Sequence, residues 1–237
     1  MHTMKHNKLW LTSLFSLFYP HYCAACGGRL QENEEALCRE CLDNMPRTPY
    51  LLNDGNLVER LFWGKFPLGR ATAFFFYRPG DAYAEVVHLL KYKGRSDLGC
   101  AMGRLMAKEL ITRSFFDGVD VLIPVPLHEK RLKQRGYNQS ERIAMGVSEL
   151  TGIPVWSSAV RRVKYTETQT QKTAQERFEN MKEVFKLNMS TRELQDKHVM
   201  LIDDVLTTSA TLTACADTLK DIQGITISIL TLALAGH

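Results

Sequence analysis

The sequence predicts an α/β protein that is built on a parallel sheet flanked by helices, with a small cysteine-rich module near its N-terminal end. Apolar strands alternate with amphipathic helices from about residue 70 onward, an order that is typical of parallel sheets. Four of the six cysteines lie between positions 23 and 41. The hydrophobic fraction of 45% and the charged fraction of 24% are ordinary for a globular protein with a core of its own.

The first segment, residues 1–18, is weakly basic and then apolar, and we expect an amphipathic helix that packs on the protein. A signal peptide for export is the alternative. It is disfavoured because Tyr19, Pro20, His21 and Tyr22 are bulky, whereas a cleavage site needs small residues. The apolar run is shorter than the about 20 residues that cross a bilayer, so no transmembrane segment is expected.

Three further segments follow. Residues 19–45 form a compact unit that holds the four cysteines. Residues 46–69 are expected to be a linker without regular structure, because Pro46 and Pro49 disfavour helix and sheet around them. The main domain then runs over residues 70–237.

The period of the apolar residues places the elements of the main domain. Continuous apolar runs, rich in β-branched residues at the end of the chain, predict buried strands. Apolar residues three and four positions apart predict helices. We expect strands at residues 71–77, 119–125, 199–202 and 225–234. We expect helices at residues 82–92, 98–111, 138–150, 173–181 and 210–220.

The cysteines near the N-terminus form two Cys-x-x-Cys pairs, Cys23 with Cys26 and Cys38 with Cys41. This spacing lets two thiolates reach one metal ion from a tight turn. Gly27 and Gly28 follow the first pair, where such a turn needs a residue that tolerates positive φ. Four thiolates leave no open position for water, so the expected Zn²⁺ is structural. Two disulfides or a redox pair are the alternatives. The clustering in a chain with its own core favours metal binding in a reducing, cytoplasmic compartment.

The segment 198–219 carries the clearest signal for a ligand. An apolar strand leads to the adjacent carboxylates Asp203 and Asp204, and a hydroxyl-rich turn then opens a helix. Free N–H groups at a helix start favour an anion, and carboxylates accept hydrogen bonds from the hydroxyls of a ribose. The alternative is an ordinary capped turn, with Thr208 or Ser209 as the cap. The predicted phosphate-binding residues are Thr207, Thr208, Ser209, Ala210 and Thr211.

A basic segment between residues 128 and 142 contains five Lys or Arg residues and two Glu. It follows the strand at residues 119–125, so it is expected to border the same cleft. It could neutralise a pyrophosphate, or it could track the phosphates of a single nucleic acid strand while Tyr137 stacks on a base. A solvated amphipathic helix is the third reading. The candidate residues are Val125, Pro126, Lys130, Arg131, Lys133, Arg135, Tyr137 and Asn138.

Taken together, these motifs resemble the ComF family, in which a zinc module is joined to a phosphoribosyltransferase-like domain. Segment 198–219 resembles the phosphoribosyl-pyrophosphate motif of type I phosphoribosyltransferases. Besides the cysteine pairs, the resemblance is carried by Leu90-Lys91-Tyr92-Lys93-Gly94, Ile123-Pro124-Val125-Pro126-Leu127-His128, Lys130-Arg131-Leu132, Arg135-Gly136-Tyr137-Asn138-Gln139, Gln169, Glu176-Arg177 and Asn180.

The resemblance implies a type I phosphoribosyltransferase-like sheet with a zinc-ribbon-like module. It implies phosphoribosyl pyrophosphate or ribose phosphate as ligand, with Mg²⁺ accompanying the pyrophosphate. It also implies a cytoplasmic accessory of DNA uptake or single-stranded DNA handling, working with a DNA-uptake helicase at the inner face of the membrane. An active phosphoribosyltransferase of nucleotide salvage and a non-catalytic sensor of phosphoribosyl pyrophosphate are the alternatives.

The chain departs from the family pattern at two places. Ser209 stands where the family usually has glycine, and a serine there would be strained if its φ were positive. Residues 166–169 read Thr-Glu-Thr-Gln where the family often has prolines.

Overall fold

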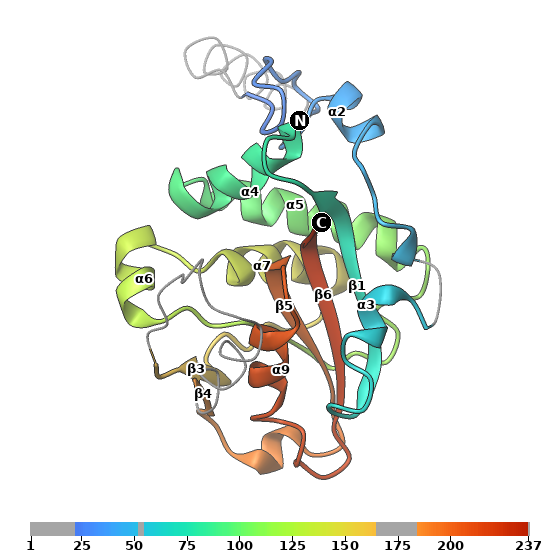
Figure 1. Cartoon of the computed structure of the whole chain (residues 1–237), viewed down its shortest axis with the longest axis vertical. Helices are drawn as coiled ribbons and strands as arrows, with labels where there is room; N and C mark the ends of the chain where they lie inside the picture. The colour runs from blue at the N-terminus through green and yellow to red at the C-terminus, as the bar shows by residue number, and fades with distance from the viewer. Residues whose placement is uncertain (1–21, 52–54, 165–183, 237) are drawn as a thin grey trace, which may run out of the picture.

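The computed structural model describes residues 22–51, 55–164 and 184–236. Within these ranges the centre is a four-stranded sheet in the order β1-β6-β5-β2. Figure 1 labels β1, β6 and β5 of this sheet. Each neighbouring pair of strands in it is parallel. The strands are β1 (Leu68–Tyr77), β2 (Val121–Pro124), β5 (His198–Leu206) and β6 (Thr226–Ala235). The predicted parallel sheet flanked by helices is therefore confirmed.

Both faces of the sheet are buried, which explains why its strands are continuous apolar runs in the sequence. On β5, for example, Val199 and Leu201 join one hydrophobic cluster, while Met200 and Ile202 join the other. The alternation follows from the two-residue period of a strand. All four predicted strands are present. β5 runs further than expected, to Leu206, so that it carries the two carboxylates itself.

Helices cover the two faces. α4 (Ala82–Tyr92), α5 (Ser96–Ile111) and α7 (Gln139–Thr151) contribute to the cluster on one face, which also takes in the cysteine module. α9 (Ala210–Ala216) lies against the opposite face beside β5 and β6 (Figure 1). The helix predicted over 210–220 is shorter than expected, since hydrogen-bonded turns replace it after Ala216.

Residues 46–69 are less irregular than expected. They contain the short helices η1 (Pro49–Leu51) and α3 (Leu57–Arg60). α3 forms because the Asn56 side chain caps it, accepting hydrogen bonds from the N–H groups of Val58 and Glu59. The expectation of a linker without regular structure is therefore corrected at these positions.

Four further short elements lie within the described residues of the main domain, and one of them is a helix in the basic segment, where an amphipathic helix was one of the three readings. Within the basic segment, α6 (Glu129–Arg135) starts at His128 and ends at Gly136, whose φ is 81°. The strands β3 (Val160–Arg162) and β4 (Phe185–Leu187) form a separate antiparallel pair. A short helix, η2 (Thr191–Leu194), precedes β5.

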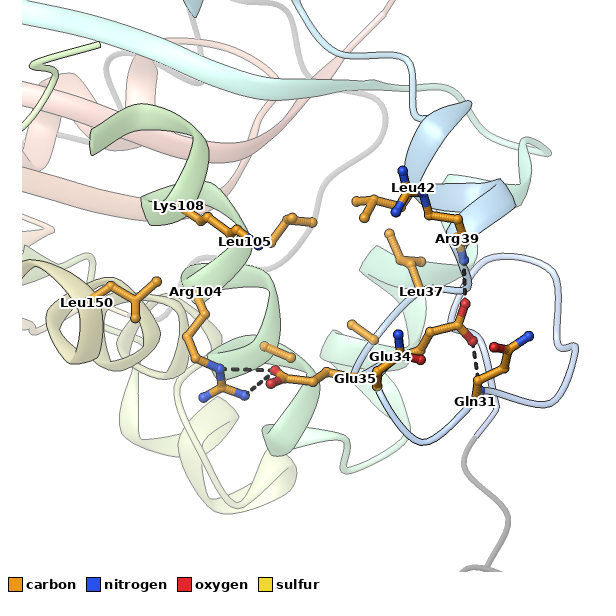
Figure 2. Close-up of a pocket in the computed structure, with 13 residues that line it drawn as sticks. Gln31, Glu34, Glu35, Leu37, Arg39, Leu42, Arg104, Leu105, Lys108 and Leu150 are labelled. Carbon is orange, nitrogen blue, oxygen red and sulfur yellow. Dashed lines mark hydrogen bonds and ion pairs between the residues drawn. The ribbon is translucent and has the colours of Figure 1, made fainter. Parts of the chain in front are cut away.

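The cysteine module packs against α5. It includes α2 (Arg39–Asp43), and the Tyr83 hydroxyl of α4 donates to the Cys41 carbonyl at 2.7 Å. A groove of about 760 Å³ lies between residues 31–42 and α5, as Figure 2 shows. Arg104 spans one side of it, with ion pairs to Glu35 at 2.8 Å and to Glu149 at 2.7 Å.

Some predictions lie outside the described residues. They are the N-terminal helix over 1–18, the helix over 173–181, and the resemblance residues Gln169, Glu176, Arg177 and Asn180. Across the ranges that are described, the helices are too short or too polar for any of them to span a bilayer.

Candidate functional site

The predicted carboxylate pair lies near the carboxyl end of β5, at the sheet edge where open α/β proteins bind ligands. Asp203 is held from two sides. Its Oδ1 accepts hydrogen bonds at 2.9 Å from the Ser140 hydroxyl of α7 and from the backbone N–H of Asp204. Ser140 is itself buried. The orientation of Asp203 is therefore fixed by the first turn of α7.

Burial and, to a smaller extent, the neighbouring charge of Asp204 raise the pKa of Asp203 to about 7, and the Ser140 hydrogen bond only partly opposes this rise. The folded protein thus favours the protonated form of Asp203 more than water does, since the ordinary pKa of an aspartic acid is 3.8. The stability that this carboxyl contributes is fully present below pH 3.8 and is lost as the pH rises through about 7. At neutral pH the pair carries less than two full negative charges.

Asp204 has a different partner. Its Oδ2 lies 3.4 Å from Nζ of Lys91, which is near the end of α4. The side chain of Asp204 is 13% exposed and that of Lys91 is 24% exposed, so the pair is largely enclosed. Lys91 belongs to a motif of the resemblance, but the sequence did not connect it with the carboxylates.

The predicted phosphate-binding residues follow β5 directly. Thr207 and Thr208 are exposed, and Ser209, Ala210 and Thr211 are half-buried. Ser209 has a φ of −67°, so the serine in place of glycine causes no strain. Its side chain makes no hydrogen bond to the first turn of α9. Ser209 therefore does not act as the simple helix cap that was the alternative. Instead its Oγ accepts a hydrogen bond from Lys65 at 2.8 Å.

Two side chains of the basic segment, Asn138 and Tyr137, form hydrogen bonds to backbone groups of neighbouring elements. The Asn138 side chain caps α7 by accepting from Ser140 N–H at 3.1 Å, and its Nδ2 donates to the Val125 carbonyl at 3.0 Å. The Tyr137 hydroxyl donates to the Leu90 carbonyl at 2.5 Å. Val125 and Pro126 are buried at the end of β2. These contacts connect β2, α4 and α7. Roles in ligand binding for Val125, Pro126, Tyr137 and Asn138 stay predictions.

The exposed part of the basic segment is α6. Lys130 and Lys133 are exposed, and Arg131 and Arg135 are half-buried. The Arg135 guanidinium lies 5.3 Å from the ring centroid of Tyr92.

Tyr92 is 64% exposed, whereas Tyr137 is half-buried. His88 lies beside Tyr92, with ring centroids 5.2 Å apart. The accessible aromatic surface next to α6 is therefore Tyr92, which the sequence reasoning did not single out.

A second cation near the carboxylates comes from the unexpected strand β3. Burial lowers the pKa of the Arg162 guanidinium, the nearby Arg131 lowers it further, and the charge of Asp203 opposes both. The guanidinium also lies 5.4 Å from the ring centroid of Phe185 in β4. The β3–β4 pair therefore brings a buried positive charge into the electrostatic environment of Asp203.

The four predicted metal ligands converge as expected. The sulfur atoms of Cys23, Cys26, Cys38 and Cys41 all lie within 4.8 Å of one another, and Cys26 Sγ is 3.8 Å from Cys38 Sγ. Zn–S bonds of about 2.3 Å in a tetrahedron place sulfur atoms about 3.8 Å apart, so the cluster fits a zinc ion. Gly27 has the predicted positive φ, 70°.

Backbone groups around the cluster favour thiolates. Cys38 N–H donates to Cys23 Sγ at 3.3 Å, and Gly28 N–H donates to Cys26 Sγ at 3.4 Å. Burial acts to raise the pKa of Cys23, but backbone N–H donors outweigh it and lower this pKa to about 7. Burial and the neighbouring cysteines raise the pKa of Cys41. A bound cation would relieve the repulsion among the thiolates, as in four-sulfur metal sites.

Four residues were missed at the carboxyl edge: Ser140, Lys91, Arg162 and Lys65. All four reach the site from segments far away in the sequence, and Lys65 is 144 positions from its partner Ser209. A single sequence carries no signal for such a contact. Only Lys91 stood in a motif that could have drawn attention to it.

The chain is similar to proteins that are named for competence or for DNA utilization. It is 30% identical over 207 residues to "Competence protein F" of Haemophilus influenzae, which covers 84% of this chain and 78% of that one. It is 30% identical over 200 residues to "DNA utilization protein YhgH" of Shigella flexneri, covering 83% of both. "Competence protein ComFC" of Bacillus subtilis is 24% identical over 192 residues, covering 81% and 68%.

No protein-family model matches the chain. Among solved structures, it is similar to a purine phosphoribosyltransferase from Pyrococcus horikoshii, with a TM-score of 0.34 and 20% identity, over 56% of this chain and 71% of that one. The chain has a four-cysteine module and a parallel sheet. Its sequence is also similar to that of the Haemophilus protein over most of the length of both chains. On these grounds the chain belongs to the ComF family of competence proteins.

Proposed function

We propose that the carboxyl edge of the sheet binds the ribose 5-phosphate part of phosphoribosyl pyrophosphate, and that the protein serves DNA uptake or the handling of single-stranded DNA. One observation carries the pocket. The Asp203–Asp204 pair leads directly into a hydroxyl-rich turn, and lysines from two distant segments reach this same stretch. Carboxylates suit ribose hydroxyls, and the turn with its cations suits a phosphate.

Each group has its own task in this proposal. Residues 207–211 supply backbone N–H donors to the 5-phosphate, and the hydroxyls of Thr207, Thr208 and Thr211 add donors of their own. Asp204 accepts hydrogen bonds from a ribose hydroxyl, and the ion pair with Lys91 orients that carboxylate. Asp203, which is half protonated near pH 7, can donate as well as accept a hydrogen bond.

The basic segment would serve the pyrophosphate or a nucleic acid strand. α6 carries four cations, and its last residue lies close to the exposed Tyr92. The four cations are Lys130, Arg131, Lys133 and Arg135. A row of cations beside an exposed ring is the arrangement that binds single strands without sequence preference. The names of the relatives, "Competence protein F" and "DNA utilization protein YhgH", support a DNA-related role.

The remaining parts of the proposal follow from the family. The cysteine module would hold one structural Zn²⁺, and Mg²⁺ would enter as the counter-ion of the pyrophosphate. The cytoplasm, at the inner face of the membrane, would be the place of action, with a DNA-uptake helicase as partner.

Replacing Asp204 with Asn tests the pocket. This change removes a carboxylate acceptor and leaves Lys91 without its ion pair, so the affinity for phosphoribosyl pyrophosphate should fall about tenfold or more. Isothermal titration calorimetry with and without Mg²⁺ measures it. The matched control is Asp221→Asn, since Asp221 is exposed. Equal affinities for all three proteins, or no binding by the unchanged protein, would contradict the pocket.

An assay of pyrophosphate release distinguishes an active phosphoribosyltransferase from a non-catalytic sensor. Release of pyrophosphate on addition of a nucleobase, abolished by Asp204→Asn, would identify an active phosphoribosyltransferase. Binding without release would identify a protein that senses phosphoribosyl pyrophosphate.

Replacing Arg135 with Ala tests the nucleic acid surface. The guanidinium beside Tyr92 is expected to contact a backbone phosphate, so affinity for a single-stranded oligonucleotide should fall and its salt dependence should become shallower by about 0.7 in the log–log slope. Fluorescence anisotropy at several salt concentrations measures both. Arg113→Ala, an exposed change beyond the end of α5, is the control and should behave like the unchanged protein. Absence of binding at low salt would remove this role.

A further inference from the structure

Lys65 lies in the turn between α3 and β1, on the face of the sheet that α9 covers. Its Nζ donates to Ser209 Oγ at 2.8 Å. Nζ also lies 5.9 Å from the ring centroid of Phe62, which is fully buried and therefore fixed in position. The ammonium thus has a defined place beside the hydroxyl-rich turn, although its stem starts in a distant part of the chain.

The charge of Lys65 is poorly balanced. Among the described residues no carboxylate oxygen lies within ion-pair distance of its Nζ. Burial lowers the pKa of the ammonium, and the field of Asp217, at the far end of α9, only partly opposes this. An ammonium has three donors, and the neutral hydroxyl of Ser209 occupies one of them.

The position of this cation decides which ligand would satisfy it. An anion held by the N–H groups of residues 207–211 would lie next to Ser209 and hence within reach of the ammonium. A charge-assisted hydrogen bond to such an anion is about twice as strong as one to a neutral hydroxyl. A neutral sugar would offer no such gain.

We propose that Lys65 is a ligand of the terminal phosphate in this site, and that it selects 5-phosphorylated sugars over unphosphorylated ones. The inference rests on the proposed function. Ser209, at the position where glycine is usual in the family, holds the ammonium beside the turn before the phosphate arrives. A glycine at this position would have no hydroxyl for this contact.

A purely structural tie between the turn and the α3–β1 connection is the competing explanation. The two explanations predict different effects on ligand binding when either side chain is removed. If the pair is only a tie, then loss of either side chain should have the same effect. If Lys65 binds phosphate, then loss of the lysine should weaken binding far more than loss of the serine hydroxyl.

The experiment compares Lys65→Met, Ser209→Ala and Lys108→Met by calorimetric titration with ribose 5-phosphate and with phosphoribosyl pyrophosphate. Methionine keeps the length and the apolar stem of the lysine, and Lys108 is an exposed lysine of α5 that serves as control. We expect Lys65→Met to weaken both ligands about tenfold. We expect Ser209→Ala to stay within about threefold, and Lys108→Met to match the unchanged protein. Thermal melts should show all three variants folded.

The outcomes separate the two claims. If Lys65→Met binds like the unchanged protein while Asp204→Asn is weakened, Lys65 is not a phosphate ligand and the pocket stands. If Lys65→Met and Ser209→Ala are weakened equally, the pair is a structural tie and the proposal is wrong. If the unchanged protein binds neither ligand, the proposed pocket and the role of Lys65 are both overturned.

Discussion

Replacement of Cys41 by serine is expected to abolish metal binding and to destabilise the whole chain, not the module alone. Structural zinc sites contribute about 10 kcal/mol or more to the folding of small modules, because such units bury too little apolar surface by themselves. A loss of at least about 3 kcal/mol should remain after the rest of the fold adjusts, which lowers Tm by about 6–12 °C in a chain of this length.

The effect should spread because the module shares a core with the main domain. Ala24, Leu30 and Leu37 belong to the same hydrophobic cluster as Met102 and Met106 of α5. The hydrogen bond from Tyr83 to the Cys41 carbonyl adds a polar link to α4. Loss of the metal would therefore expose one side of α5 to water.

Metal content and thermal melting of the same preparations measure this prediction. The control is Cys100→Ala, which removes a cysteine of α5 outside the cluster and should keep one metal ion per chain. An unchanged Tm in Cys41→Ser, or a full metal content in that variant, would contradict a structural role for the module.

The second large effect is expected at the crossing of α5 and α7, where Gly146→Ala should lower stability by about 2 kcal/mol. A Cβ at Gly146 would lie 2.0 Å from the Cys100 carbonyl oxygen and 2.8 Å from its carbon. Across the same contact, a Cβ at Gly103 would lie 2.1 Å from the Ile143 oxygen. The obstacles are backbone atoms, so the two helices would have to move apart.

The sign of this prediction is diagnostic. In an ordinary helix position, glycine to alanine stabilises by about 1 kcal/mol, because alanine is the better helix former. A fall in stability therefore reports the close approach of the helices. It also bears on the site, since α7 carries Ser140, which orients Asp203.

Chemical denaturation of Gly146→Ala and of Met145→Ala measures the effect. Met145 is an exposed neighbour in the same helix, so its replacement should change stability by less than about 0.5 kcal/mol. A Gly146→Ala protein that is more stable than the unchanged chain would show that the helices do not meet at this glycine.

The sequence predicted the elements whose signal is local. The sheet strands are continuous apolar runs because both of their faces are buried. α4 was predicted over its observed residues from the spacing of Val86, Val87, Leu89 and Leu90, of which all but Leu89 are buried. The cysteine cluster was predicted because ligand spacing alone specifies two metal-binding turns.

The missed elements are those whose signal is weak or distant. α3 has four residues, and its start is defined by the Asn56 cap and not by an apolar period. β3 and β4 have three residues each, too few to show alternation. In the site, the carboxylates and the hydroxyl turn were found because they are consecutive. Lys65, Lys91 and Ser140 arrive by tertiary folding, so no local pattern could place them.

The most direct test of the ribose phosphate pocket is the change of backbone amide resonances when ribose 5-phosphate is titrated into the isotope-labelled protein. The pocket predicts that the largest shifts fall on residues 203–211, with smaller shifts at Lys65 and Lys91 and none in the groove at residues 31–42. Shifts confined to that groove, or an unchanged spectrum at millimolar ligand, would contradict it.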